Sequence, residues 1–589
     1  MKLREALQSY TVTHLKELVG VSGGPGPEGN RKEQLVRYLY DRLTHPDSLA
    51  QLWDGLDELS KKAVAAAYHG DGRFNEEAFL ARHGDLPGRR GGDVFYDLAE
   101  DIMFGYRREP AVLDLFLHRS QLPRELMDPL APLVPPPEKF LPEGLVEAPG
   151  AVEIDGETLP LWRADTEEAG PHDLAAYLRL YVRDELRGGS TSDRMSPTGA
   201  GNLLANLLDG DFLVHGERVR PADTIRPSGL DWFVRQSGLA HYYRGRRRLT
   251  DAGEALLRHQ DPETLLDAFE TWAGGSSDEL GRIKALKGIN AKRTHLSPPA
   301  ERREAIIEAL SWCPVGVWIS TDEFYRALLI WEFDIELDRG YESNLSVEHP
   351  FYGRVYYLER EGRTLIETLY MNAVLMESLG SIGALDLLYL PPGDAGRGDD
   401  SLGSYYSLHD GLTHFRVNPL GAYLLGQAAE YAPPRRLDAP LFTIDPSFAL
   451  TLEDPESLTP NLRDQLHQLA VEEDAGHYRL DTQTVLGALE SGEDLRHLAD
   501  FLAGRHEGPL PEQVTDWLEE IGVNSKAFRH TGDALFIKVL SQALVQMILE
   551  DPALGKFAKA LEARTLVIPS NKERAFRKRL KELGYLLSR

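Results

Sequence analysis

The sequence predicts a multi-domain, mainly α-helical chain that carries small α+β modules. Three observations lead to this prediction. At 589 residues the chain is too long for a single hydrophobic core. Apolar residues recur at the spacing of one helix face through most of the chain, whereas strand-like runs are short. A proline-rich break at 132–137 separates two of the segments. We divide the chain into 1–48, 49–140, 150–260, 275–432 and 437–589.

The composition excludes several classes of protein. With 42% apolar and 27% charged residues, it is typical of a globular protein. The single cysteine, Cys313, rules out an internal disulfide framework and favours a reducing, cytoplasmic location. No basic-then-apolar leader opens the chain, and Lys538 interrupts the longest apolar stretch, 534–549. We therefore expect neither a secretion signal nor a membrane span.

The net charge of −28 bears on the partner. A chain this acidic repels phosphates at long range, so any contact with DNA must come from local basic patches. Simple solubility is the alternative explanation of this charge, and the charge by itself favours it. Charge alone does not decide between a nucleic-acid partner and a protein partner.

Residues 1–48 contain two helical patterns joined by a loop rich in glycine and proline, 20–30. The second pattern starts with Arg31 and Lys32. This arrangement resembles the SAP motif, a helix–extended–helix module, and the resemblance implies that Arg31 and Lys32 contact DNA. The loop is longer than is usual for that motif, and a small helical hairpin with no DNA-binding role fits the same pattern.

Residues 49–140 have the helix order of a degenerate winged helix, and a short sequence frame then recurs in the next two segments. The run 248–257, RLTDAGEALL, aligns with 416–425, RVNPLGAYLL. Each copy predicts a strand that leads into a helix capped by Thr250 or Asn418. With helices upstream, this order is typical of winged-helix domains, so we predict tandem winged helices in 150–260 and 275–432.

Basic residues near these modules are the candidates for DNA contact. One group ends at the first residue of the run 248–257, and a second lies in the basic segment 278–303. The candidates are Arg244, Arg246, Arg247 and Arg248, and then Lys284, Lys287, Lys292 and Arg293. The aromatic residues that follow, in 311–333, can stack on bases beside such a run. Their helical spacing is more typical of a core, and we predict that they are buried.

Residues 437–589 alternate strand-like and helical segments. Strand-like runs occur at 441–444, 448–452, 478–480, 534–539 and 566–568. The order of elements resembles the N-terminal domain of the XPB/Ssl2 helicase family, most specifically where Tyr478-Arg479-Leu480 precedes a helix that ends in glycine and then a Pro509-Leu510-Pro511 run. The resemblance implies a small α/β domain that binds protein partners and that bacterial chains often carry without a motor.

The last predicted helix, 571–583, is strongly basic. Ser570 and Glu573 have the spacing of a capping box at its start. Its cations Arg574, Arg577, Lys578 and Lys581 fall opposite the apolar stripe. We predict that they form a surface for an acidic partner; a solvated helix face is the alternative.

No residues for catalysis stand out. The phosphate-binding loop of a helicase motor is absent, and neither a cysteine pair nor a His-Glu-x-x-His sequence is present to hold a metal. The acidic series Glu332, Asp334, Glu336 and Asp338 has period two, and we predict a strand with a solvated face. A cryptic nuclease that uses these carboxylates is the weakest hypothesis.

These observations predict a non-catalytic DNA-binding accessory or scaffold protein. It would dock a helicase or nuclease partner in DNA repair or in defence against foreign DNA. The alternative is a protein–protein adaptor or transcription regulator whose winged helices are interaction modules without direct DNA binding. We expect no cofactor, no small-molecule substrate and no membrane partner.

Overall fold

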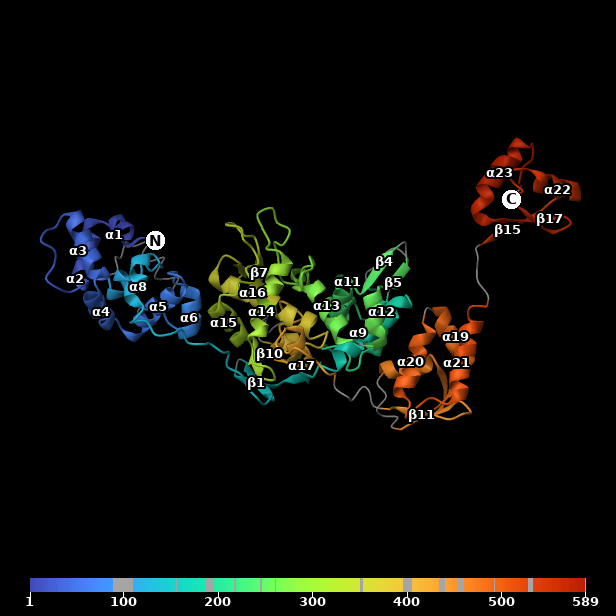
Figure 1. Ribbon diagram of the computed structural model, residues 1–589, viewed down its shortest axis with the longest axis horizontal. Coiled ribbons are helices and arrows are strands. Elements are labelled where there is room, and N and C mark those ends of the chain that lie inside the picture. The colour runs from blue at the N-terminus through green and yellow to red at the C-terminus, as the bar shows by residue number, and fades with distance from the viewer. Residues whose placement is uncertain are drawn as a thin grey trace. The chain divides into compact units, whose positions relative to one another are not determined.

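The computed structural model describes residues 1–87, 110–154, 156–186, 195–216, 219–243, 246–259, 261–349, 353–395, 405–433, 440–453, 460–491, 493–527 and 533–587. The chain is about 48% helical with small sheets, which confirms the prediction of a mainly α, multi-domain protein. Figure 1 labels the elements along the chain. In the part of the chain that is described, no helix is long and apolar enough to cross a bilayer.

The chain forms two compact units. The first comprises Met1–Leu441, Leu452–Gln468 and Ser491–Glu493. The second comprises Phe442–Thr451, Leu469–Glu490 and Asp494–Arg589. Each unit is described by itself below.

The N-terminal part of the first unit is a helical module with its own hydrophobic core. Thr11 caps the second helix by accepting a hydrogen bond from His14 N at 3.3 Å. The loop after that helix is held to the third one, because Arg42 Nε donates to Ser22 O at 2.9 Å. The helices are α1 (Leu3–Ser9), α2 (Val12–Val21), α3 (Lys32–Thr44), α4 (Pro46–Asp54), α5 (Glu58–His69), α6 (Glu76–His83) and α8 (Met127–Leu130).

Next along the chain comes an arrangement of three helices, a hairpin and a further helix, which we call the first repeat. The helices are α9 (Ala169–Val182), α10 (Pro197–Asn206) and α11 (Arg226–Gln236). The antiparallel hairpin β4 (Ala240–Tyr243) and β5 (Arg246–Leu249) follows, and then α12 (Asp251–His259). A short hairpin, β1 (Ala151–Ile154) and β2 (Glu157–Pro160), precedes it.

The second repeat has the same order of main elements with one additional strand and one inserted hairpin. Its elements are α14 (Pro299–Ser311), β6 (Trp318–Ser320), α15 (Thr321–Trp331), the hairpin β7 (Ser346–His349) and β8 (Gly353–Tyr356), α16 (Arg360–Ala373), the π-helical turn Val374–Leu379, β9 (Leu385–Tyr389), β10 (Leu412–Val417) and α17 (Pro419–Leu424). Its sheet has the order β3-β9-β10-β6, in which β3 (Trp162–Ala164) precedes the first repeat in sequence. Helix α13 (Pro262–Ala273) connects the two repeats.

The predicted caps of the recurring frame are confirmed in both repeats. Gly253 N donates to Thr250 Oγ1 at 3.2 Å, and Gly421 N donates to Asn418 Oδ1 at 2.9 Å. A Cβ atom at Gly253 would lie 2.0 Å from the carbonyl oxygen of Leu239, and one at Gly421 would lie 2.0 Å from that of Ala384. Each capped helix therefore packs directly on the backbone just before its own hairpin, where only glycine fits.

The two repeats share one continuous core and pack through their third helices. The core runs from Leu174 to Leu425. Helix α11 contacts the π-helical turn that continues α16, and a Cβ atom at Gly229 would lie only 2.1 Å from Glu377 O. From Ile366 onward every residue of α16 and of the π-helical turn is buried. The third helices thus hold the repeats together.

The acidic series at the end of α15 differs from its prediction. Glu332 ends the helix in the left-handed conformation, with φ of 59°. Asp338 is buried and accepts from His295 N at 2.8 Å and Gly340 N at 2.9 Å. The predicted solvated strand is wrong, because these carboxylates end a helix and organise a turn.

The second unit begins with an antiparallel sheet under helices. The sheet has the order β11-β12-β14-β13. Asp481 caps the helix that follows β14 and accepts from Thr484 N at 2.8 Å. The elements are β11 (Phe442–Ile444), β12 (Ala449–Leu452), β13 (Ala470–Asp474), β14 (His477–Leu480), α19 (Thr482–Ser491), α20 (Leu495–Arg505) and α21 (Glu512–Asn524); α18 (Pro460–His467) belongs to the first unit.

The C-terminal module has a separate three-stranded sheet covered by two helices. Its order is β15-β17-β16, and both strand pairs are antiparallel. Ile537, Leu566 and Phe576 form part of its core. The elements are β15 (Ala534–Lys538), α22 (Gln542–Glu550), β16 (Lys559–Glu562), β17 (Thr565–Pro569) and α23 (Glu573–Glu582). The alternating sequence pattern suggested an α/β domain, but hairpin pairing gives α+β modules here.

Candidate functional site

Arg31 and Lys32 stand at the start of α3. Arg31 is the N-cap residue, and its backbone N–H donates to Gln34 Oε1 at 3.2 Å. Both side chains are exposed. They lie at a helix N-terminus, where backbone N–H groups also attract anions. The structure therefore presents this pair to solvent, as a DNA-contacting helix start requires.

The predicted arginine cluster falls on the β4–β5 hairpin of the first repeat. Arg248 is exposed and lies opposite His241 in the antiparallel register. Arg246 and Arg247 belong to β5, but their side chains lie outside the described part of the structure, and so does Arg244. Arg248, whose side chain is the one of this cluster that the structure describes, thus lies on the surface of the hairpin.

The four candidates of the basic segment are all exposed, and two of them are paired with carboxylates. Lys284 Nζ lies 3.0 Å from Asp223 Oδ1 and 5.7 Å from the centre of the Tyr405 ring. Arg293 Nη1 lies 2.8 Å from Glu342 Oε2. Lys287 and Lys292 are also exposed. Exposed pairs of this kind are weak and exchange partners readily.

Three other arginines of the same segment point inward, and one of them, Arg282, links the two repeats. Arg303 is fully buried and donates to Glu279 Oε1 at 2.7 Å and to the carbonyl oxygen of Trp272 at 3.0 Å. The buried Arg302 donates to Asp278 Oδ2 at 2.9 Å. Arg282 donates to Glu377 Oε1 at 2.7 Å. Much of the basic character of this segment therefore lies in the protein interior.

Glu377 is the centre of a buried ionic cluster. Besides Arg282, it contacts His409, whose Nε2 lies 2.7 Å from Glu377 Oε2. Burial alone would raise the pKa of this carboxyl, but Arg282 and His409 hold the pKa below its ordinary value. Arg282 also donates to Thr224 O at 2.6 Å, just before α11. The cluster joins the two repeats and leaves no group free for an external ligand.

The cations of α23 face solvent. Arg574, Lys578 and Lys581 are exposed. Arg577 is half-buried and donates to Glu573 Oε1 at 2.7 Å and to Leu587 O at 2.6 Å. The helix starts after a 3-10 turn at Ser570–Lys572, and its N-cap, Lys572, makes no side-chain cap. The predicted capping box is therefore wrong, whereas the basic face is present.

Arg579 on the same helix has a different role. Its Nη2 donates to Asp551 Oδ2 at 2.9 Å, and Asp551 also accepts from the backbone N–H of Leu554 at 3.0 Å. The hydrogen bond from Arg579, with those from the backbone, lowers the pKa of Asp551 to about 2. Arg579 holds the helix to the module, so the exposed face is left to the other cations.

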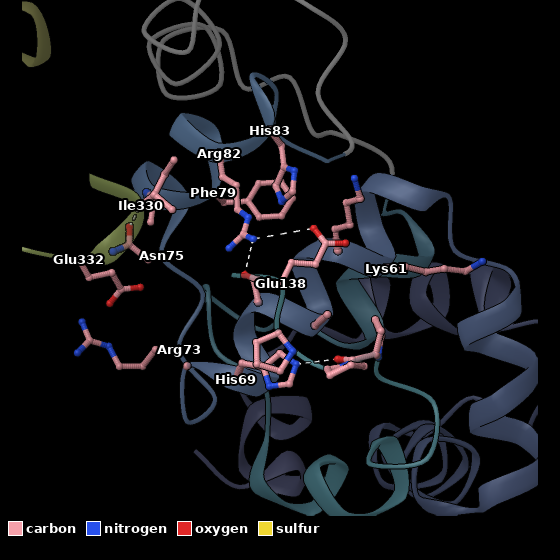
Figure 2. Close-up of a pocket in the computed structure, with 18 of the residues that line it drawn as sticks. Lys61, His69, Arg73, Asn75, Phe79, Arg82, His83, Glu138, Ile330 and Glu332 are labelled. Atoms are coloured by element: carbon pink, nitrogen blue, oxygen red, sulfur yellow. Dashed lines mark hydrogen bonds and ion pairs between the residues drawn. The ribbon is translucent and has the colours of Figure 1, made fainter. Parts of the chain in front are cut away.

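The structure also contains a cleft that the sequence does not predict. It has a volume of about 540 Å³, within the usual range for small-ligand sites. Helices α5 and α6, the proline-rich segment 135–138 and the end of α15 line it. Figure 2 shows Arg82, His83 and Phe79 entering from α6, with Arg73 and Glu332 nearby and Lys61 farther round the wall.

Cations and carboxylates share the lining of this cleft. Lys61 Nζ lies 3.0 Å from Glu58 Oε1, and Arg82 Nη2 donates to Glu138 O at 2.6 Å (Figure 2). Lys62 and Arg73 are exposed and form no ion pair with any residue that the structure describes. Burial, with Lys62 and Arg82 close by, lowers the pKa of His83. A neutral His83 leaves the cleft's positive charge to its lysines and arginines.

Four aromatic rings form a cluster, and Trp331, Phe333 and Phe140 are close in sequence to residues that line the cleft. Trp331 lies between Ile330 and Glu332, both of which line the cleft. Its ring centre is 5.5 Å from that of Trp312 and 6.0 Å from that of Phe140. Phe333 completes the group at 5.0 Å from Trp312. Trp312 is 51% exposed, so this cluster is accessible to a ligand.

The prediction that the aromatic residues of 311–333 belong to the core is wrong for Trp312 and holds for the others, which are buried or packed against the core. Trp318, Phe324 and Tyr325 are buried. Trp331, at the end of α15, is partly buried and packs against the core, whereas Trp312, at the end of α14, is exposed. Spacing along the sequence did not reveal which residues stand at helix ends.

The remaining candidates for chemistry are the thiol of Cys313 and groups of side chains that could bind a metal ion. Cys313 is buried, and burial raises its pKa well above the ordinary value, so its thiol stays protonated. Within the described ranges, no group of three or more His, Cys, Asp or Glu side chains is placed to hold a metal ion.

A scan of the sequence against protein-family models found no match, and a search of curated proteins also found none.

Proposed function

We propose that the protein is a non-catalytic DNA-binding accessory protein that docks a helicase or nuclease partner, in DNA repair or in defence against foreign DNA. The observation that carries this proposal is the repeated order of helices, hairpin and capped helix. In both repeats the third helix is followed by two antiparallel strands, which is the order of a winged helix. Tandem winged helices are a common way to hold a protein on DNA.

The contact with DNA in this proposal differs from the usual winged-helix mode. A winged helix normally places its third helix in the major groove. Here α11 of the first repeat packs on the end of α16 in the second repeat, so neither helix is free to enter the major groove of DNA. The remaining candidate surfaces are the β4–β5 hairpin with Arg248, the start of α3 with Arg31 and Lys32, and the exposed cations of 284–293. Such surfaces contact phosphates, and we propose weak binding with little sequence preference.

The partner-docking role is proposed for the second unit. Its resemblance to the N-terminal domain of XPB-type helicases supports a protein-binding module. The exposed cations Arg574, Lys578 and Lys581 on α23 would meet an acidic surface of that partner. Such charges accelerate association more than they strengthen the final complex.

The alternative is a protein–protein adaptor without direct DNA binding. The burial of both third helices favours it, because the surface that most often reads DNA is used here to join the repeats. The net charge of −28 favours it as well.

A titration of duplex DNA over a series of salt concentrations tests the proposal. The variant Arg246→Glu, Arg247→Glu and Arg248→Glu should weaken binding of all sequences equally. It should also reduce the slope of log affinity against log salt by about 0.9 for each lost phosphate contact. Arg354→Glu, on the β7–β8 hairpin, is the matched control. Equal binding by the triple variant and the wild-type protein would contradict DNA contact through this hairpin.

A further inference from the structure

The cleft and the aromatic cluster share two segments of the chain, although α5 and α6 supply most of the cleft lining and Trp312 comes from the end of α14. Residues 135–138 line the cleft, and Phe140, two residues later, contacts the aromatic cluster. Ile330 and Glu332 line the cleft, while Trp331 and Phe333 belong to the cluster. Arg326 fixes this arrangement, because its Nη1 donates to Ala81 O at 3.0 Å and its guanidinium lies 5.0 Å from the centre of the Phe140 ring. Two segments that line the cationic cleft therefore also carry three of the four rings of the aromatic cluster.

From this arrangement we infer that the cleft and the aromatic cluster together bind single-stranded nucleic acid. Lys62 and Arg73 would contact phosphates, and an unpaired base would stack on the exposed ring of Trp312. The inference rests on the proposed DNA-binding function and specifies the form of the ligand. Proteins that bind single strands combine a positively charged groove with aromatic stacking surfaces in this way.

Two uncompensated cations in the cleft suit the phosphates of a nucleic-acid backbone. The positive groups of Lys61 and Arg82 are largely offset by Glu58 and Glu138. The cations of Lys62 and Arg73 are not offset in this way by any described residue. On a chain with a net charge of −28, two uncompensated cations in one cleft form a local site for an anion.

The aromatic cluster favours an unpaired base over other ligands. Bases in a duplex are stacked on one another, so only a single strand offers a free ring face to Trp312. An acidic peptide would also satisfy Lys62 and Arg73, but it would leave the aromatic surface without a role. The half-exposure of Trp312, at 51%, is what distinguishes the two ligands.

The test uses the full-length protein and fluorescence anisotropy. The probes are an oligothymidylate of about 12 nucleotides, which falls within the usual site sizes for single-strand binding, an abasic strand of the same length and a duplex. The variants are Trp312→Ala, Trp312→Phe and the double variant Lys62→Ala with Arg73→Ala. Arg360→Ala, an exposed cation at the start of α16 that belongs to none of the candidate DNA contacts, is the matched control.

We expect Trp312→Ala to weaken oligothymidylate binding about tenfold, because one base loses its stacking partner. It should leave the abasic strand unaffected, and Trp312→Phe should restore much of the loss. The double variant should lower the log–log salt slope for the single strand by about 1.4, which corresponds to two phosphate contacts. A ribose strand of equal sequence, bound as well as or better than the deoxyribose strand, would identify RNA as the source of the single strand.

Three results would overturn the inference. If both variants bind the single strand like the wild-type protein while salt-sensitive duplex binding persists, this inference fails and the proposed function stands. If the wild-type protein binds neither form of DNA, both fail. If a polyglutamate peptide competes as well as the oligothymidylate and Trp312→Ala has no effect, the cleft binds acidic peptides.

Discussion

The basic segment 278–303 and helix α23 look alike in sequence, but the structure takes part of the segment's cations into the interior and leaves most of those of α23 on the surface. In the segment, Arg302 and Arg303 are buried against carboxylates between the two repeats. On α23, Arg574 and Lys578 are exposed. The comparison teaches that a basic stretch of sequence indicates either an internal ionic network or a binding surface, and that only the positions of the acidic partners distinguish them.

The physical reason for the difference is the cost of burying a charge. A guanidinium can leave water only if carboxylates and carbonyl oxygens replace its hydration. Arg303 meets this condition with Glu279 and with the carbonyl oxygens of Trp272, Ala273, Gly275 and Ser277. On α23 water solvates the exposed cations, so they need no such partners.

The first prediction concerns Arg303 and has the largest expected effect. Replacing Arg303 by Met removes the cation and leaves Glu279 buried without its counter-ion. We expect the free energy of unfolding of the repeats to fall by about 3–5 kcal/mol at neutral pH. Urea denaturation followed by tryptophan fluorescence measures it, since Trp272 lies under the Arg303 guanidinium at 5.1 Å. Arg574→Met on α23 is the matched control and should have almost no effect.

The pH dependence of this variant provides a further check. Burial raises the pKa of Glu279, and Arg303 opposes that rise. Without Arg303 the pKa rises further, so the folded state favours the protonated carboxyl. A raised pKa adds stability at low pH that is lost as the pH increases through the folded-state value. The deficit of Arg303→Met should therefore shrink on acidification, and a deficit independent of pH would contradict the buried ion pair.

The second prediction concerns Glu367, a buried carboxyl of the second repeat whose hydrogen-bond partners are tyrosines. Glu367 accepts from Tyr357 at 2.6 Å and from Tyr325 at 2.8 Å. Burial raises its pKa from 4.5 to about 7, although these hydrogen bonds and Arg363 oppose the rise. Since a pKa difference of one is worth about 1.4 kcal/mol, protonation contributes about 3 kcal/mol of stability.

The sign of this effect is fixed by the raised pKa. The contribution is fully present below pH 4.5, which is the ordinary pKa, and is lost as the pH increases through 7. Glu367→Gln should flatten the fall in unfolding free energy over this range, and denaturation at several pH values measures the difference from the wild-type protein. Parallel curves for the two proteins would show that Glu367 keeps an ordinary pKa.

Local features of the fold were predictable from the sequence, whereas long-range contacts were not. The caps at Thr250 and Asn418 depend on four consecutive residues, so the recurring frame revealed them. The pair between Arg303 and Glu279 spans 24 residues along the chain, and the cleft brings together three separate segments. No local pattern specifies such contacts. The packing of α11 on the end of α16 likewise depends on tertiary structure.

The third prediction concerns the exposed face of α23 and has the smallest effect on stability. Arg574→Ala, Lys578→Ala and Lys581→Ala should together change the free energy of unfolding by less than about 0.5 kcal/mol, because water already solvates these cations. Arg579→Ala, on the same helix, should destabilise the C-terminal module, since Asp551 then loses its partner.

The triple variant should nevertheless slow association with an acidic partner and remove the salt dependence of that association. Pull-downs from native lysate with the wild-type protein, the triple variant and a chain that ends at Pro434 measure this. Recovery of the same partners by all three would place the docking surface outside the second unit, and a large loss of stability in the triple variant would mean that α23 uses its cations internally, as Arg303 is used.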